Sequence, residues 1–489
     1  MRRVNLDQSR ADQAARWADD RLDVLVVGGG IVGAGIARDA AMRGLRTGLV
    51  DQHDLAFGTS SRSSRLLHGG LRYLAQGRIG LVREASREKM TLHRIACHLS
   101  QPLPFAFPTY RRTRWPLWQL RIGVKLYDWL CGARNLGPSQ ALTPEEVAER
   151  FPGINPHGLT GAVRYFDGLT NDSRLVLDTL RSAARQGAIV SNYTRVEDAL
   201  PCPSGWTCHL RDVRTDRPGQ LVARSVVNAT GPWAQSLPQS TIRLRLTKGV
   251  HLVIDSRRLP VPDAVVITQK DRILFAIPWG QRVILGTTDT DYDGPIEDVA
   301  TEPDDVGYIL QVANTAFPSA ALRETDVIST WAGLRPLIDS GRGGPSDISR
   351  AHEIRLSDSG WLDVAGGKLT TYRLIAEQAV DRLVQYLGHH GPPCRTAQQP
   401  LLEPEEVQGV SGVLPPEVTA EAVEHYCAGE WAVHLDDVMI RRTGWYYYLP
   451  DVESVARQVA GWMAEIFGWD QSRQEAELAR IACKRPEGS

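Results

Sequence analysis

Near its start, the chain alternates short apolar runs with a glycine-rich turn in a way typical of a strand–helix–strand unit. Residues 23–27, DVLVV, form an apolar run of the kind that a buried parallel strand needs. The next residues, GGGIVG, lead into IVGAGIARDAAMR, which predicts a helix that Gly44 ends as a C-terminal cap. A second apolar run, RTGLV, predicts another strand, which ends at Asp51.

The glycines and the aspartate of this unit match the physical needs of a dinucleotide site. Gly28 allows a tight turn out of the strand, and Gly30 lets the backbone approach a pyrophosphate at the helix N-terminus. Gly33 lets the helix pack closely on the sheet, and Asp51 can accept hydrogen bonds from both hydroxyls of an adenosine ribose. We therefore expect a bound dinucleotide here rather than a glycine-rich turn without a ligand.

The segment that follows, residues 54–74, is rich in small side chains. Two interpretations are open from the residues alone. The segment wraps a cofactor, with Thr59, Ser60 and Ser61 offering hydroxyls to phosphate oxygens, or it is a Ser/Thr-rich surface loop.

Two later strand-to-glycine turns favour FAD over a nicotinamide dinucleotide. In residues 361–384 an apolar strand, WLDVA, enters a turn and then an amphipathic helix, and in residues 226–234 the run VVNATGPWA ends in a similar turn. A helix N-terminus at the first of these turns would face an anionic or polarised atom. Turns so widely spread along the chain indicate a long cofactor that crosses one sheet. The cofactor contacts expected at these two turns are Ala229, Gly231, Gly366, Gly367, Lys368, Leu369 and Thr370.

Composition narrows the class of protein. A chain of 489 residues exceeds the size of one compact core, so two or three domains are expected. With 56 basic and 57 acidic residues there is no basic excess, which argues against nucleic-acid binding. Seven widely spaced cysteines without a CxxC pair indicate reduced thiols in a cytoplasmic chain, with no metal site. Residues 1–22 read as a polar leader, and no apolar run approaches the ~20 residues that span a bilayer.

Two aromatic segments have more than one interpretation. Residues 115–130, WPLWQLRIGVKLYDWL, predict an amphipathic helix that lies in a membrane interface or packs inside a cap domain. The run RRTGWYYYLPD, near residue 445, predicts an interface or core patch rather than a substrate site.

In their order along the chain, these segments resemble the flavin-dependent glycerol-3-phosphate dehydrogenase family. The similarity is carried by GGGIVGAGIARDAAMRG, GTSSRSSRLLHGGLRYL, RYFDGLTNDSRLVLDTLRSAA, VVNATGPWA, LTKGVHLVI, ILFAIPWGQRVILGTTDTDY, STWAGLRPL, SRAHEI and GGKLTTYR. It runs from about residue 23 to 379, and the tail is similar to that family's C-terminal helical domain.

The resemblance implies an α/β fold in which an FAD-binding, Rossmann-like domain of the flavin amine-oxidase type is interleaved with an antiparallel β-sheet substrate domain. The expected FAD-binding parts are about 23–100, 161–240 and 346–390, and the substrate or cap parts are about 101–160 and 241–345. Short strands such as GVHLVI and RVILGTT agree with a sheet in the latter range. Residues 391–489 then form a C-terminal helical domain.

The resemblance also implies the residues that carry the chemistry. The substrate would be sn-glycerol 3-phosphate, oxidised to dihydroxyacetone phosphate by hydride transfer from carbon 2 to flavin N5. Arg72, Tyr73 and Arg350 would bind substrate, with the two arginines on the phosphate. Arg335 and Lys368 would also bind substrate and take part in catalysis: Arg335 would polarise the C2 oxygen, and Lys368 would lie on the flavin N1 side. His68 would be the general base, although a buried, hydrogen-bonded histidine is the alternative.

No motif in the sequence identifies the electron acceptor. A quinone is expected, which would place the protein in the cytoplasm, peripheral on the cytoplasmic face of the inner membrane, and oxygen is the close variant. Another small hydroxy acid or amine as substrate, or a flavin-binding sensor without activity, are the other hypotheses. A homodimer is among the assemblies considered.

Overall fold

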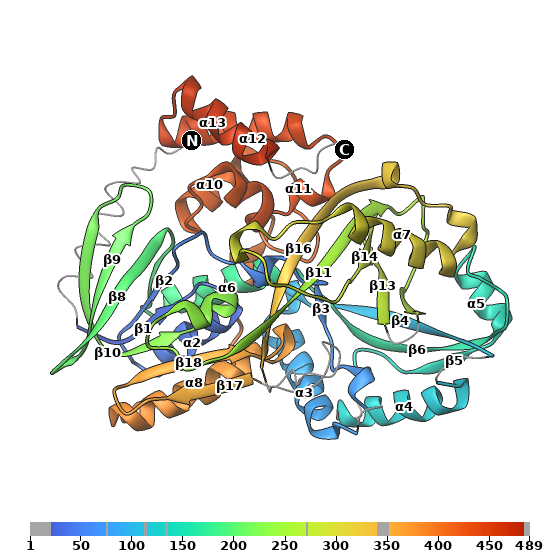
Figure 1. Cartoon of the computed structure of the whole chain (residues 1–489), viewed down its shortest axis with the longest axis horizontal. Coiled ribbons are helices and arrows are strands. Elements are labelled where there is room, and N and C mark those ends of the chain that lie inside the picture. Colours follow the sequence, from blue (N-terminus) through green and yellow to red (C-terminus); the bar gives the residue numbers. More distant parts are fainter. Residues whose placement is uncertain are drawn as a thin grey trace.

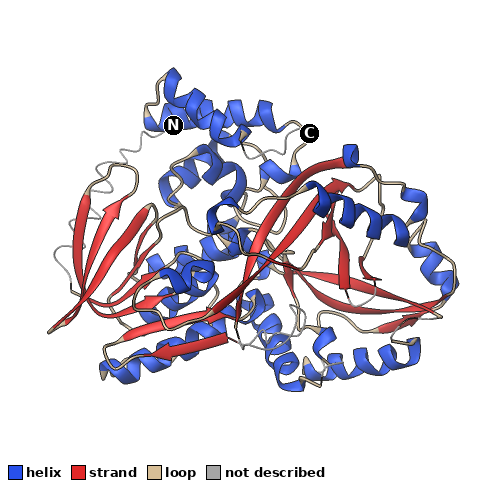
Figure 2. Cartoon of the chain, viewed as in Figure 1, coloured by secondary structure: helices blue, strands red, loops and turns tan. Residues whose placement is uncertain are grey.

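The computed structural model describes residues 21–74, 77–111, 113, 115–132, 135–269, 272–339 and 352–483. The expected polar leader lies outside the described residues up to residue 20, and so does Arg350. Figure 2 shows the strands gathered in two groups with helices packed around them.

The first sheet has the strand order β17-β18-β10-β1-β2-β7, and a hairpin of β8 and β9 extends it from β10. The strands β18, β10, β1, β2 and β7 run parallel, so their carboxyl ends meet at one edge. The bounds are β1 Leu22–Val27, β2 Thr47–Val50, β7 Ile189–Ser191, β8 Thr194–Cys202, β9 Gly205–Asp212, β10 Pro218–Asn228, β17 His352–Leu356 and β18 Trp361–Gly366.

Three helices cover one face of this sheet (Figure 1). They are α2 Ile31–Met42, α6 Asp172–Arg185 and α8 Tyr372–Leu387. Small residues of α2, such as Ala34 and Ala37, are fully buried against Val24 and Val26 of β1. The other face of the sheet packs Leu25 against Trp206 of the hairpin. Burial on both faces explains why residues 24–27, VLVV, are continuously apolar.

The second sheet has the order β15-β11-β14-β13-β12-β4-β6-β3, with β16 paired to β11 and β5 paired to β6. It is antiparallel except where β12 runs parallel to β4. The bounds are β3 Leu66–Leu67, β4 Gln101–Tyr110, β5 Gln140–Leu142, β6 Leu159–Leu169, β11 Leu244–Asp255, β12 Ala264–Gln269, β13 Arg272–Trp279, β14 Arg282–Gly286, β15 Thr290–Asp291 and β16 Val327–Ile338.

Two strands belong to a different sheet from the one that the expected domain ranges imply. Most of β6 and all of β3 fall in the ranges expected for FAD binding, yet both belong to the second sheet. The reason is the pairing of β6 with β4 along almost its whole length. The second sheet is covered by α3 Ile79–Ile95, α4 Leu117–Leu130, α5 Pro144–Arg150 and α7 Pro303–Ala316.

The C-terminal segment forms helices that lie over the junction of the two sheets (Figure 1). These are α9 Pro404–Val407, α10 Ala420–Gly429, the π-helix η9 Asp437–Arg442, α11 Trp445–Tyr448, α12 Val452–Phe467 and α13 Gln471–Ala482. Short 3-10 turns lie at η1 Thr59–Ser61, η2 Leu71–Tyr73, η3 Cys97–Leu99, η4 Gly231–Ser236, η5 Ile296–Asp298, η6 Pro318–Ala320, η7 Glu324–Asp326 and η8 Leu369–Thr371.

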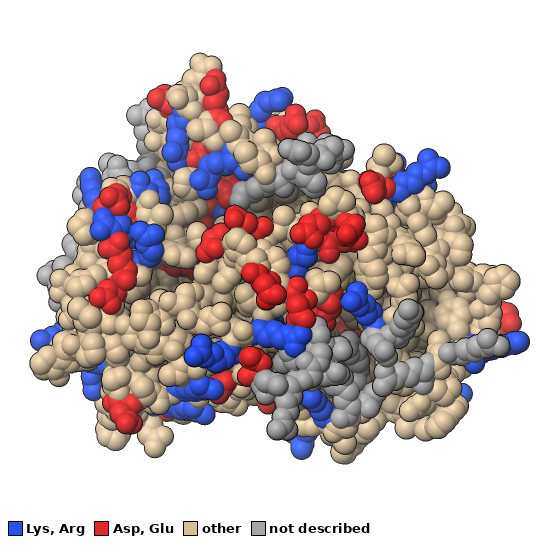
Figure 3. Space-filling view, viewed as in Figure 1, with Lys and Arg blue, Asp and Glu red and all other residues tan. Residues whose placement is uncertain are grey.

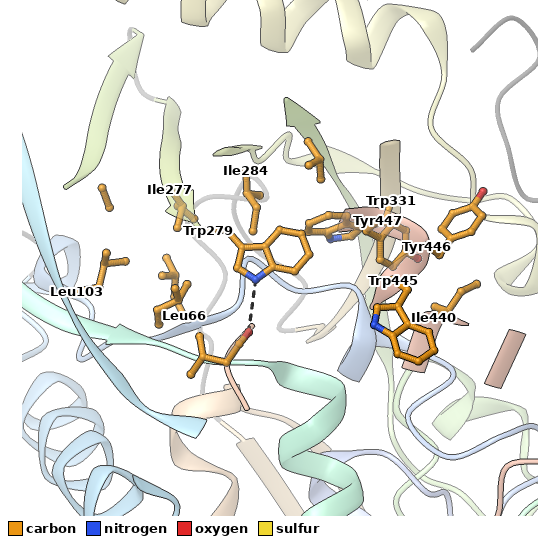
Figure 4. Packing of buried hydrophobic residues seen from close by; sticks show 14 of the residues in the cluster. Leu66, Leu103, Ile277, Trp279, Ile284, Trp331, Ile440, Trp445, Tyr446 and Tyr447 are labelled. Carbon is orange, nitrogen blue, oxygen red and sulfur yellow. Dashed lines mark hydrogen bonds between the residues drawn. The ribbon is translucent and has the colours of Figure 1, made fainter. Parts of the chain in front are cut away.

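The aromatic run of the tail is a core patch. Trp445, Tyr446 and Tyr447 are buried and pack toward Trp331 of β16 and Trp279 of β13 (Figure 4). Trp279 donates its indole N–H to the carbonyl oxygen of Val413 at 3.4 Å. The prediction of a core patch is confirmed, and the second sheet and the C-terminal segment share one hydrophobic cluster.

Candidate functional site

The first glycine turn leaves no room for side chains. Gly28 has φ +113°, and a Cβ there would lie 2.5 Å from the carbonyl oxygen of Ala229 on the neighbouring strand. A Cβ at Gly33 would lie 2.0 Å from the carbonyl oxygen of Gly28. Only glycine fits at both positions, so the turn and the close helix–sheet packing predicted from the sequence have a direct steric cause.

The three strand-to-glycine turns line one cleft of about 430 Å³ at the carboxyl ends of β1, β10 and β18. Its walls include Gly28, Gly30, Asp51, Thr59, Ser60, Ala229, Gly231, Gly366, Gly367, Lys368 and Leu369. The sequence separates these residues widely, and the parallel sheet brings them together because strands of one sense end at one edge.

Two of the predicted cofactor contacts, Ser61 and Thr370, have hydrogen-bond partners within the protein. Ser61 is buried, and its hydroxyl lies 3.5 Å from the carbonyl oxygen of Gly58. Thr370 is buried and accepts the backbone N–H of His68 at 3.0 Å through its hydroxyl oxygen. Neither is among the residues that line the cleft. By contrast, the hydroxyl oxygen of Ser60 accepts the N–H of Ile31 at 3.0 Å, which places the loop on the N-terminus of α2.

The carboxyl group of Asp51 lies at the wall of this cleft. Its two oxygens accept the backbone N–H groups of Gly29 at 2.7 Å and His53 at 2.8 Å. Burial raises the pKa of Asp51 to about 7, and the two N–H donors only partly oppose this rise. A half-buried carboxylate with spare lone pairs beside a glycine turn fits the ribose hydroxyls of FAD.

A second cavity, of about 670 Å³, adjoins the cleft. Both are lined by Thr59, Ser60, Gly367, Lys368 and Leu369, so a long ligand can extend from one into the other. Of the predicted substrate and catalytic residues, His68, Tyr73, Arg335 and Lys368 line this second cavity. Arg350 lies outside the described residues, as does the side chain of Arg72.

Two of the cations that line this cavity, Arg335 and Lys368, are held in defined positions. The Arg335 guanidinium donates to Asp289 Oδ1 at 3.2 Å and to Thr287 Oγ1 at 2.9 Å. Gly249 faces it on β11, where a Cβ would lie 2.3 Å from Arg335 Nη2. The Lys368 ammonium group lies 3.9 Å from the centre of the Tyr73 ring, which is a cation–π contact.

His68 is fixed through its backbone. Its N–H donates to Thr370 Oγ1, and its carbonyl oxygen accepts from the same hydroxyl group at 3.2 Å. The next residue, Gly69, donates its N–H to the Tyr127 hydroxyl oxygen at 2.7 Å. The imidazole itself is half-buried at the cavity wall.

His251 also lines this cavity and was not predicted. It is 2% exposed, stacks on Trp331 with ring centres 5.1 Å apart, and has Nε2 2.8 Å from the hydroxyl oxygen of Ser64. Burial, and then the charges of Arg335 and Arg65, lower the pKa of His251 to about 3. The only signal for it in the sequence is one polar residue in the otherwise apolar strand GVHLVI.

Apolar side chains also line this cavity, and some of them come from α4. They are Phe105, Phe107, Phe275, Leu120, Ile122 and Leu126. Along α4, Trp118, Ile122, Leu126 and Trp129 are exposed by 64%, 63%, 37% and 69%. Residues 117–130 thus form an amphipathic helix that packs on the second sheet through Leu120 and Val124 and also exposes an apolar stripe. Within the described ranges, no helix has the length and apolar character to cross a bilayer.

Comparisons with known proteins agree with this arrangement. A family model described as FAD dependent oxidoreductase matches residues 23–373, and one described as the C-terminal domain of alpha-glycerophosphate oxidase matches residues 371–474. The glycerol-3-phosphate dehydrogenase of Mycobacterium leprae is 34% identical over 96% of this chain and 89% of its own length. The aerobic glycerol-3-phosphate dehydrogenase of Staphylococcus aureus (strain MRSA252) is 39% identical over 77% of this chain and 70% of its own.

Solved structures point the same way. The glycerol-3-phosphate dehydrogenase from Bacillus halodurans, complexed with FAD, has a TM-score of 0.79 at 30% identity and covers 97% of both chains. The fold and the glycine-lined cleft are those of an FAD-dependent oxidoreductase, which confirms the predicted fold class and cofactor. Within that class, the chain belongs to the glycerol-3-phosphate dehydrogenase family.

Proposed function

We propose that this enzyme oxidises sn-glycerol 3-phosphate to dihydroxyacetone phosphate and passes the two electrons to a quinone. The observation that supports this most is the second cavity, whose lining combines fixed cations, one of which (Lys368) also lines the FAD cleft, with many apolar side chains. The cations suit a small phosphate ester, and the apolar side chains suit an apolar acceptor. The relatives named for this activity supply the substrate by analogy.

The residues have separable tasks in this proposal. Arg335, held by Asp289 and Thr287, would orient the C2 oxygen and stabilise negative charge that develops on it. His68 would accept the hydroxyl proton, because a histidine with a pKa of about 3, as at His251, is a poor base at neutral pH. His251 would instead act as a neutral hydrogen-bonding group. Bound FAD would supply the two-electron chemistry at carbon 2.

The test is anaerobic reduction of the purified holoenzyme. We expect sn-glycerol 3-phosphate to bleach the visible flavin band, and the enantiomer sn-glycerol 1-phosphate to leave it unchanged. Arg335→Gln should slow bleaching about 10²-fold or more, as for loss of one transition-state donor. The matched control is Arg245→Gln, which removes a neighbouring exposed Arg–Asp pair (Arg245–Asp291, 2.6 Å). A flavin that stays oxidised would reject the substrate and send the search to hydroxy acids and amines.

The acceptor needs its own experiment. Reduced enzyme is mixed with a short-chain naphthoquinone, a short-chain benzoquinone or dioxygen, and reoxidation is followed. We expect the quinones to react faster than dioxygen. Ile122→Glu, at an exposed apolar residue of the cavity lining, should slow reoxidation by quinone and leave reduction by substrate unchanged. Faster reaction with dioxygen would make the enzyme an oxidase.

We also propose that the protein attaches to a membrane surface through the same helix. The exposed stripe of α4 carries Arg121 and Lys125 beside it, a composition that favours an anionic lipid interface. We expect sedimentation with vesicles that contain phosphatidylglycerol, and a loss of this binding in Trp118→Glu. Leu200→Glu, at another exposed apolar residue on β8, is the control. Localisation at the cytoplasmic face of the inner membrane and assembly as a homodimer remain predictions.

A further inference from the structure

A buried carboxylate links the FAD cleft to the C-terminal segment. Residues 51–60 form the stretch of chain that lines the cleft through Asp51, His53, Phe57 and Thr59, among others. Asp54 belongs to the same stretch but does not line the cleft, and it is 1% exposed. Its partners lie almost four hundred residues later, in the π-helix η9.

Two consecutive arginines of η9 bind this carboxylate. Arg442 donates from Nη1 to Oδ2 at 2.6 Å and from Nη2 to Oδ1 at 2.8 Å, and Arg441 Nε lies 2.5 Å from Oδ2. Asn192 donates its side-chain amide to Oδ1 at 2.9 Å. Burial alone would raise the pKa of Asp54, but the charges of Arg442 and Arg441 lower it to about 2. The carboxylate is therefore ionised and has no capacity left for another ligand.

Both arginines are also held by other residues of the C-terminal segment. Arg441 binds Asp437 Oδ1 at 2.5 Å, and Arg442 donates to the carbonyl oxygen of Glu430 at 2.8 Å. Both are buried, with 3% and 0% exposure. A π-helical turn presents these two neighbouring side chains to one carboxylate, and such turns are frequent at functional sites.

On the loop side, the stretch around Asp54 contacts the first glycine turn and the cleft. Ala56 donates its N–H to the carbonyl oxygen of Gly29 at 3.0 Å. The ring of Phe57 stacks on His53 with centres 4.1 Å apart, and the Arg441 guanidinium lies 5.9 Å from the Phe57 ring. Movement of Asp54 would therefore shift the wall of the cleft as well as the backbone beside Gly29.

We propose that the C-terminal segment is part of the FAD site, because Arg441 and Arg442 position the 51–60 loop through Asp54. These three are positioning residues that contact no substrate. They hold the loop in the conformation that binds FAD. The loop is therefore already ordered before FAD binds, which lowers the entropic cost of binding.

The first test measures FAD affinity and turnover separately in the full chain. Asp54→Asn should raise the dissociation constant for FAD at least tenfold, whereas kcat with excess FAD and sn-glycerol 3-phosphate should stay within about threefold of wild type. Arg442→Lys, which keeps one charged donor, should give an intermediate FAD affinity. Wild-type affinity in both variants would overturn the proposal.

A matched control separates positioning from general stability. Glu477 of α13 is buried, accepts from His434 Nδ1 at 2.7 Å, and makes no contact with Asp54. Glu477→Gln should lower the melting temperature while FAD affinity stays at the wild-type value. An equal loss of FAD affinity in Glu477→Gln would overturn the proposal.

A measurement on the wild-type protein keeps the proposal testable if the variants do not fold. Hydrogen exchange is compared with and without FAD. FAD should protect the amides of residues 438–443 as well as those of residues 54–61. Protection confined to the loop would overturn the proposal. The dissociation constant for FAD and the hydrogen exchange do not depend on the substrate, so failure of the substrate assignment would affect only the comparison of kcat.

Discussion

Asp51 and Asp54 lie close together in sequence, yet their carboxyl groups have opposite surroundings. The hydrogen bonds that Asp51 accepts come from backbone N–H groups, which offset only part of the desolvation, so its pKa is raised to about 7. Asp54 meets two guanidinium groups, so its pKa is lowered to about 2. One carboxyl group can therefore respond to a ligand at neutral pH, while the other is a permanent anion that fixes the loop.

The raised pKa of Asp51 predicts a pH dependence of FAD binding. Between the ordinary pKa of about 3.9 and about 7, the folded apoprotein holds a proton at Asp51 that the unfolded chain lacks, so this group favours folding at low pH and loses that contribution as pH rises through 7. The ribose hydroxyls need the carboxylate, so binding releases the proton. We predict that FAD affinity weakens as pH falls below 7, by up to about tenfold per unit.

Fluorescence titration of apoprotein with FAD across this range measures the effect. Asp51→Asn should bind more weakly at neutral pH and show no such slope. A slope of the same size in Asp51→Asn would assign the proton to another group.

His68 carries a second prediction at the scale of one residue. His68→Asn should lower kcat by about 10²–10⁴ with the flavin content unchanged, because the variant loses a proton acceptor at the cavity wall. His157→Asn, at an exposed loop position, should be indistinguishable from wild type. If His68→Asn keeps full kcat, the buried-histidine interpretation is the better one.

At the scale of elements, α4 carries the exposed apolar stripe on one side and contacts the loop that contains His68 on the other. The Tyr127 hydroxyl on its inner face accepts from Gly69 and donates to Asp167 Oδ1 at 2.5 Å, and Lys89 binds the same oxygen at 2.8 Å. The packing around this network has no spare volume. A Cβ at Gly69 would lie 2.4 Å from Ser86 Oγ and 2.5 Å from the Tyr127 hydroxyl oxygen.

Gly69→Ala should therefore lower both stability and kcat. We expect a loss of about 1–3 kcal/mol in the free energy of unfolding, as for other overpacked sites. Denaturant unfolding and steady-state kinetics measure the two effects. Gly80→Ala is the control, since a Cβ there meets no atom within 4 Å and lies in the first turn of α3. Equal stability of the two variants would show that the loop relaxes without cost.

The sequence predicts elements best where their cause is local. The strand–turn–helix of β1 and α2 follows from apolar runs and from glycines that sterics require, and Asp51 follows from its spacing. The membership of β6 in the second sheet depends on pairing with β4, which no local pattern encodes. His251 and the Asp54–Arg442 pair were missed for the same reason, since each depends on contacts between distant segments.

For the whole molecule, the shared clusters predict coupled unfolding. The C-terminal segment and the second sheet have one hydrophobic core, and the cleft joins three strands of the first sheet. We predict that FAD at 100 times its dissociation constant stabilises the protein by about 2.7 kcal/mol. It should also raise the melting temperature of the C-terminal helices. Calorimetry with and without FAD checks this, and a C-terminal transition that does not move with FAD would contradict it.

The strand order has a consequence for synthesis on the ribosome. The central strand β1 is made first, but its neighbour β10 and the more distant β18 follow much later in the chain. A nascent or prematurely ended product therefore presents an unpaired apolar strand edge, which is a template for aggregation with other chains. The risk of aggregation ends only after β18 has been synthesised, and η9 is synthesised later still. Cofactor loading is thus a late event in the life of each new chain.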